Sequence, residues 1–146
     1  MLGSEPEVVE SYVEDGRVKL VFWPVINHGN PSVYSTVAAH CAGAQDPAQF
    51  WQMHNVLFEN QRELWSAPRD FFVGTAVNLG LDQAAFETCY DSPDALAEVM
   101  ALDSIRRDRG VFGQPTFDAN GLVFAGAMPF EQFAAALDSQ LAEATP

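Results

Sequence analysis

The chain has no closely spaced pair of cysteines and few basic residues. Its 146 residues include two cysteines and no Cys-x-x-Cys or His-x-x-x-His pair. The sequence therefore lacks a pair of ligands at the spacing typical of metal sites. Seven Lys and Arg residues against 20 Asp and Glu give a formal net charge of −13, which argues against nucleic acid as a partner. No apolar run reaches the roughly 18 residues of a membrane span, and no charged-then-apolar leader is present. We therefore expect neither a membrane span nor a signal peptide.

The composition is that of one globular domain. With a mass of 16.0 kDa and 48% hydrophobic residues, the chain should bury roughly two thirds of the surface of its unfolded form. The sequence contains no internal repeat, low-complexity tract or interdomain linker. We expect a single domain over residues 1–146, kept in solution by its acidic surface.

A proline immediately precedes a predicted strand near the end of the chain. Pro115 precedes the run Thr116–Ala119, and proline is tolerated at the first residue of a strand. A second short strand, Leu122–Ala125, follows Asn120-Gly121, a pair typical of tight hairpin turns because both positions need positive φ. After the hairpin the apolar residues recur at the helical period: Phe130, Phe133, Ala134, Leu137 and Leu141.

Helices dominate the rest of the prediction. A helix over about Pro6 to Glu14 is expected to lead into a strand, Val18–Trp23. Four or five helices should follow before Pro115. Their predicted caps and stops are Pro31-Ser32, Asp46-Pro47, Gly80, Asp82, Ser92-Pro93 and Gly110.

Several segments, taken in order, resemble the DsbA-like thiol-disulfide oxidoreductases, a class of thioredoxin-fold proteins with an inserted helical domain. The segments similar to the insert are Ala38–Gln45, Phe50–Phe58, Gly80–Asp82, Phe86 and Cys89. Those similar to the proline loop, hairpin and last helix are Gly110–Phe117, Asn120-Gly121, Gly126 and Pro129–Phe133. The resemblance implies an α/β, thioredoxin-like fold with a helical insert at residues 32–109. It also implies a cis bond before Pro115.

The chain departs from this class at its beginning and before its proline. Members begin with a strand that delivers Cys-x-x-Cys to a helix N-terminus, where the dipole lowers the pKa of the first cysteine. Here Met1–Pro6 corresponds to the middle of that helix, so the first strand and both active cysteines have no counterpart. Gln114 stands where the class more often has a small or β-branched residue. We expect a shortened form with no catalytic residue, metal or cofactor of its own.

The two cysteines have three interpretations. In the resembling class a second, structural disulfide joins the places that Cys41 and Cys89 occupy. Alternatively, both are buried reduced thiols that act as small hydrophobic side chains. The third interpretation is a catalytic Cys41 served by His40 or His54.

The resemblance also suggests a site, partners and a location. Gln114 and Pro115 are the expected substrate-binding residues, and an extended peptide or unfolded client protein is the expected partner. The first hypothesis is therefore a shortened disulfide oxidoreductase. The alternatives are a redox-inactive peptide-binding or assembly module, and a relative of the glutathione-using isomerases and transferases of this fold. The resemblance further implies the cell envelope. Because the first strand is missing, we expect either that the two flanking strands close up on each other or that a second copy supplies the pairing, which gives a homodimer.

Overall fold

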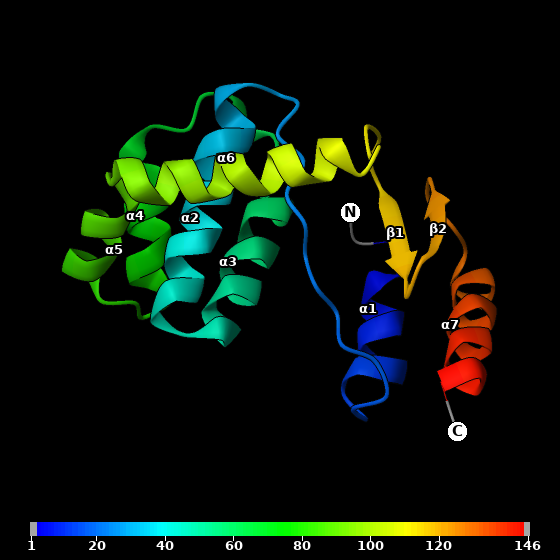
Figure 1. Ribbon diagram of the computed structural model, residues 1–146. Coiled ribbons are helices and arrows are strands. Elements are labelled where there is room, and N and C mark those ends of the chain that lie inside the picture. The colour runs from blue at the N-terminus through cyan, green and yellow to red at the C-terminus, as the bar shows by residue number, and fades with distance from the viewer. Residues whose placement is uncertain (1–2, 145–146) are drawn as a thin grey trace. The chain divides into compact units, whose positions relative to one another are not determined.

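The computed structural model describes residues 3–144, which form two compact units (Figure 1). The first, here called the helical unit, is the continuous stretch Trp23–Gly110. The second, the terminal unit, combines the chain up to Phe22 with the chain from Val111 onward. The predicted insert, residues 32–109, falls inside the helical unit. Each unit has a separate hydrophobic core.

Several helices of the helical unit begin at caps that the sequence predicts. Its helices are α2 (Asn30–Gln45), α3 (Pro47–Glu59), the 3₁₀ turn η2 (Glu63–Trp65), α4 (Arg69–Asn78), α5 (Gln83–Tyr90) and α6 (Pro93–Asp108). The side chains of Asp46, Asp82 and Ser92 each accept a hydrogen bond from a backbone N–H in the first turn that follows. Each such cap stabilises its helix by about 1 kcal/mol. α2 begins two residues before the predicted Ser32, with Pro31 in its first turn.

Gly80 ends α4 with a left-handed residue. Its φ of 79° lets its N–H donate to the carbonyl of Val77, while the N–H of Leu81 donates to that of Ala76. This pair of bonds is the Schellman motif, which satisfies carbonyls left open at a helix end. Leu81 is thereby turned into the core of the helical unit, and Asp82 can cap the next helix.

The core of the helical unit gathers around α2. Helices α3, α5 and α6 all pack against α2. The largest fully buried apolar side chains come from five different helices: Cys41, Met53, Phe72, Phe86 and Val99. Burial of a large apolar side chain contributes about 1.5–3 kcal/mol, so this cluster is the main stabilising feature of the unit. Gly43 allows α2 and α3 to approach, because a Cβ there would lie 3.1 Å from the Cβ of Phe50.

The terminal unit joins helices from both ends of the chain to a hairpin. It contains α1 (Glu5–Val8), the π-helical turn η1 (Val9–Val13), β1 (Thr116–Ala119), β2 (Leu122–Ala125) and α7 (Phe130–Ala144). The hairpin has the predicted boundaries, with Asn120 at φ 53° and Gly121 at φ 99°. These positive values explain why Asn-Gly occupies the turn.

Aromatic rings fill the core of the terminal unit. The rings of Phe117 and Phe124, paired across the hairpin, both contact Phe133 of α7 edge-on, with centroids 4.7 and 5.2 Å away. Such edge-to-face contacts add about 0.5–1.5 kcal/mol beyond burial. Tyr12 is buried beside them and donates a hydrogen bond to Asp138 of α7 at 3.0 Å. The two ends of the chain are thus held in one core.

The predicted strand Val18–Trp23 is wrong. Its residues have no helical or strand assignment, and the sheet of the described residues has two strands, β1 and β2. The composition of the segment is strand-like, but a strand exists only where a second strand supplies its hydrogen bonds. Val18 instead donates its N–H to the carbonyl of Tyr12 and packs against the core of the terminal unit.

No helix within residues 3–144 is both long and apolar enough to cross a membrane.

Candidate functional site

The loop before β1 holds both residues predicted to bind substrate. Gln114 is exposed, Pro115 is half-buried, and the peptide bond between them is cis. Thr116 Oγ1 donates to the carbonyl of Gly113 at 2.9 Å, and the N–H of Gly126 donates to the carbonyl of Pro115 at 2.8 Å. The loop is therefore fastened to its own strand and to the end of β2.

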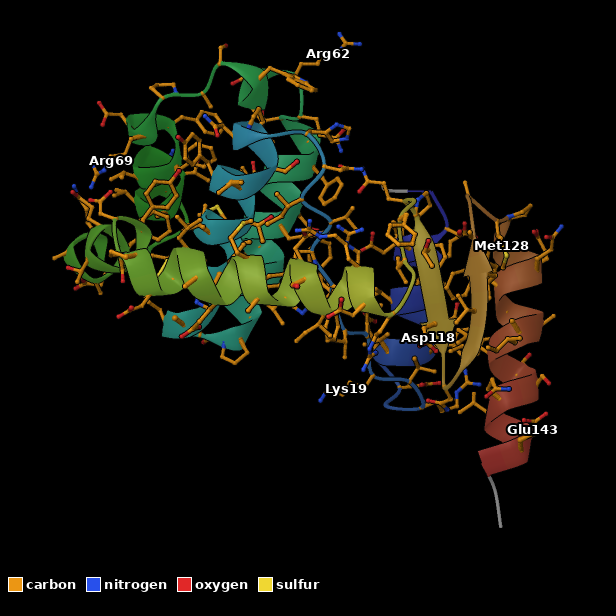
Figure 2. The ribbon with its side chains drawn as sticks, turned by 45° about the horizontal axis from the view of Figure 1, so that its top comes forward. Lys19, Arg62, Arg69, Asp118, Met128 and Glu143 are labelled. Atoms are coloured by element: carbon orange, nitrogen blue, oxygen red, sulfur yellow. A yellow bond between two sulfur atoms is a disulfide. The ribbon has the colours of Figure 1, made fainter. Side chains whose placement is uncertain are left out.

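The register of the hairpin decides which backbone groups of β1 face outward. Because Gly126 bonds to Pro115, alternate residues of β1 from Pro115 onward point their backbone groups at β2. Thr116 and Asp118 lie between them, so their N–H and C=O groups point away from β2. Within residues 3–144, β1 has no strand on that side. The Pro115 loop thus leads into an open strand edge, and Figure 2 labels Asp118 on it.

Phe112 belongs to the same loop, and the sequence interpretation missed it. This residue is 71% exposed, the largest fraction among the large hydrophobic residues described. Gly113 follows it and offers no side chain to cover the ring. The available signal was an aromatic residue in a glycine-rich loop, whereas hydrophobic character alone suggests burial.

Cys41 of α2 and Cys89 of α5 form a disulfide, with their Cα atoms 5.7 Å apart. This pairing excludes the interpretation as two reduced thiols. It also leaves Cys41 without the thiol that a catalytic role beside His40 or His54 requires. Cys41 is buried and Cys89 half-buried. Neither sulfur is a thiolate in this form of the chain.

The three histidines lie in different surroundings. His28 is exposed and its ring lies 5.8 Å from that of Trp65, whereas His40 Nε2 lies 3.2 Å from a carboxylate oxygen of Glu98. His54 is buried, with its ring 4.4 Å from that of Phe58. Among residues 3–144, no three His, Cys, Asp or Glu side chains converge in a way that could hold a metal ion.

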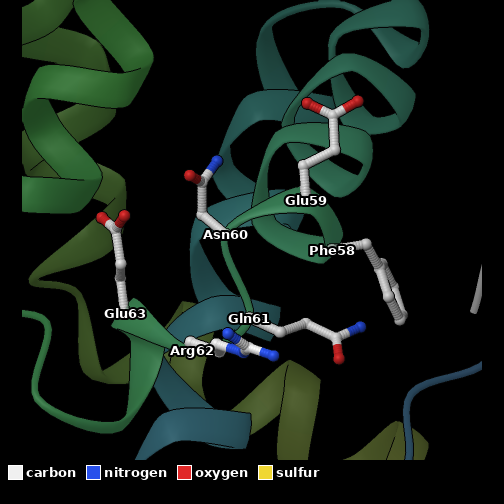
Figure 3. A pocket seen from close by; sticks show the side chains of 6 residues that line it. All are labelled: Phe58, Glu59, Asn60, Gln61, Arg62 and Glu63. Carbon is white, nitrogen blue, oxygen red and sulfur yellow. The ribbon is translucent and has the colours of Figure 1, made fainter.

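A surface pocket of about 430 Å³ lies at the turn between α3 and η2 (Figure 3). Six consecutive residues line it: Phe58, Glu59, Asn60, Gln61, Arg62 and Glu63. Figure 3 shows their side chains pointing in different directions rather than toward one centre. A binding site needs convergent polar groups, so this pocket is not a site comparable to the loop.

A buried carboxylate in the helical unit was also missed. Asp103 of α6 has no exposed surface and accepts hydrogen bonds from Arg106, Arg107 and the N–H of Ile26. Burial by itself would raise the pKa of Asp103, but the Ile26 N–H and the guanidinium of Arg106 hold it below its ordinary value. The indole of Trp23 donates to the carbonyl of Leu102 beside it at 2.9 Å. These contacts bind the start of the unit to the end of α6.

A hairpin entered through a proline loop and packed on a helix, in a chain that also contains a bundle of helices, defines a thioredoxin-like domain. Residues 2–139 match the family described as Thioredoxin, so the chain belongs to the thioredoxin family.

Two relatives extend this comparison. The chain is 33% identical over 141 residues to the Na(+)/H(+) antiporter NhaA 1 of Salinispora arenicola, a match that covers 95% of the chain and 21% of the antiporter. It is 32% identical over 66 residues to Disulfide bond formation protein D of Bacillus subtilis, covering 43% of the chain and 30% of that protein. The matched residues therefore span less than a third of the length of either relative.

Proposed function

We propose that this chain is the client-binding part of a DsbA-like thiol-disulfide oxidoreductase. In this proposal Gln114 and Pro115 receive an extended peptide, and the helical unit corresponds to the helical insert of that class. The similarity to a disulfide bond formation protein supports the choice of class. The observation that carries the proposal is the open edge of β1, which begins at the Pro115 loop.

An open strand edge binds extended peptides through main-chain hydrogen bonds. Thr116 and Asp118 each present an N–H and a C=O at the spacing of a strand, so an added peptide gains bonds at alternate residues. Affinity of this kind depends little on the client's sequence, as a protein that handles unfolded clients requires.

The cysteines of the chain do not perform the exchange in this proposal. Exchange begins when a thiolate attacks a disulfide sulfur and forms a mixed disulfide. Cys41 and Cys89 are bonded to each other, and Cys41 is buried. Exchange in a protein that contains this chain therefore needs a further thiolate, and we propose Cys41–Cys89 as a structural bond. A binding or assembly module without exchange is the second candidate, favoured by the same pairing.

The cell envelope is the location that fits this function. Disulfides persist in oxidising compartments, and the chain holds one between two of its helices. The similarity to a disulfide bond formation protein points to the same location.

Two proline variants test the role of the strand edge. Asp118 and Val123 face each other across the hairpin, and their N–H groups point to opposite outer edges. Asp118→Pro removes a donor from the open edge of β1, while Val123→Pro removes the matching donor from β2. Binding of a fluorescein-labelled, cysteine-free extended peptide is measured by anisotropy. Asp118→Pro should weaken binding about fivefold, the effect of one lost hydrogen bond.

Two further measurements complete this test. Asp118→Asn removes the carboxylate but keeps the backbone N–H, so it distinguishes the effect of the charge from that of the backbone donor. Circular dichroism verifies that each variant is folded. Equal binding by the Asp118→Pro and Val123→Pro variants would show that the edge of β1 is not the site.

A further inference from the structure

Phe112 is more exposed than an aromatic residue usually is. An aromatic ring in a folded protein usually buries most of its surface, yet this residue is 71% exposed. No side chain from Gly113 shields the ring, and a Cβ built at Gly113 would meet nothing within 4 Å. The ring lies three residues before Pro115, in the loop that leads to the open edge. A bound strand would therefore extend past it.

The terminal unit has an excess of negative charge, and the arginines nearest this loop in the sequence, Arg107 and Arg109, belong to the helical unit. From Val111 to its end the sequence contains four carboxylates and no Lys, Arg or His. Asp118 is one of these carboxylates and is exposed on β1 itself. The terminal unit has two basic residues, Arg17 and Lys19, of which Arg17 is already paired with Asp15 at 2.6 Å. A segment that approaches the edge thus meets a unit whose net charge attracts cations and repels anions.

We propose that the clients bound at this edge are extended segments rich in Lys or Arg, and that Phe112 receives one of their cationic side chains. This inference rests on the proposed function and specifies its substrate class. The face of an aromatic ring attracts Lys and Arg, and the negative charge of the terminal unit strengthens the preference. The backbone of the client supplies affinity at the edge, while its positive charge supplies selectivity.

Two peptides of equal length and equal apolar content test the selectivity. Both are cysteine-free and extended, and one carries lysines where the other carries glutamates. Anisotropy titrations compare them at about 0.1 M and about 1 M sodium chloride, which shortens the Debye length from about 10 Å to about 3 Å. At the lower salt concentration the basic peptide should bind about tenfold more tightly than the acidic peptide. This difference between the two peptides should shrink at the higher salt concentration.

Variants of Phe112 test the proposed contact between its ring and a cationic side chain of the client. Phe112→Ala should weaken binding of the basic peptide about threefold, and Phe112→Leu should weaken it as much, because leucine keeps apolar surface but lacks the aromatic face. Val21→Ala is the matched control, since Val21 is 61% exposed elsewhere in the terminal unit. Its binding should be unchanged.

The outcomes separate this inference from the function on which it rests. Equal binding of the two peptides, or unchanged binding by Phe112→Ala, would overturn the inference while leaving peptide binding intact. Failure of both peptides to bind at either salt concentration would overturn the proposed function as well.

Discussion

The carboxylate of Asp103 accepts a hydrogen bond from the backbone N–H of Ile26 at 2.9 Å, across 77 residues of chain. Arg106 and Arg107 complete the neutralisation of this carboxylate. A charge buried with partners of this kind is costly to disrupt, because removal of one member leaves the others without compensation. The first two predictions concern this cluster.

Asp103→Ala should lower the free energy of unfolding of the helical unit by about 3–5 kcal/mol, because Arg106 stays buried without its counter-charge. Tryptophan fluorescence during urea unfolding is a suitable measurement, since all three tryptophans lie in the helical unit. Ser104→Ala is the control: it is exposed on the same helix and should change stability by less than about 0.5 kcal/mol. Similar losses in both variants would contradict this prediction.

Acid should weaken the helical unit through the same carboxylate. The pKa of Asp103 is lower in the folded chain than its ordinary value of 3.8, so the unfolded chain binds the proton more readily. The stabilisation is therefore complete above about pH 5 and is lost as the pH falls through the folded pKa. Urea unfolding at a series of pH values should show a smaller acid loss in Asp103→Asn than in the wild type. Identical pH profiles would disprove the assignment.

Loss of the disulfide should destabilise the helical unit. Cys41 and Cys89 are 48 residues apart, and closing a loop of that length restricts the unfolded chain by about 4 kcal/mol. The double variant Cys41→Ser, Cys89→Ser should unfold at correspondingly lower urea concentration than the oxidised wild type. The wild type in excess dithiol reductant should behave like the variant. No shift in either sample would mean that the bond contributes nothing to stability.

The chain should show no thiol-disulfide exchange activity by itself. Its two sulfurs are bonded to each other, and no Cys-x-x-Cys is present. Insulin reduction and the refolding of a reduced, disulfide-containing client should both proceed at the uncatalysed rate. Turnover above that rate, abolished by Cys41→Ser, would identify as catalytic a cysteine that we propose as structural.

The homodimer expected from the sequence stays a prediction, and the open edge of β1 is the place where a second copy would pair. We predict a dimer at micromolar concentration, visible by light scattering. Because each copy carries a formal charge of −13, salt should strengthen this dimer, whereas it weakens binding of a basic peptide. Asp118→Pro should yield monomers and Val123→Pro should not. A monomer at every salt concentration would exclude this use of the edge.

Local sequence signals predicted the parts of the fold that depend on neighbours in the chain. Asn120-Gly121 set the hairpin, and Asp46 and Gly80 set helix ends, because turns and caps bond within a few residues. The segment Val18–Trp23 failed as a strand because pairing depends on residues far away in the sequence.

The limits of prediction at the candidate site have the same origin. The sequence identified Gln114 and Pro115 through their motif, but not the exposure of Phe112, which depends on what surrounds the loop. Asp103 sits at helical spacing from two arginines, the pattern of a solvated helix face, and the sequence does not show that the segment containing Ile26 bonds to it.

The joining of the two chain ends has a consequence during synthesis on the ribosome. Ser4 donates a hydrogen bond to the carbonyl of Met128, 124 residues later, and Tyr12 pairs with Asp138. The helical unit can fold once residue 110 has emerged, but α1 must wait for α7. Until α7 follows, the nascent chain therefore carries a folded helical unit, while Val8 and Tyr12 still lack the α7 side chains that bury them in the finished core.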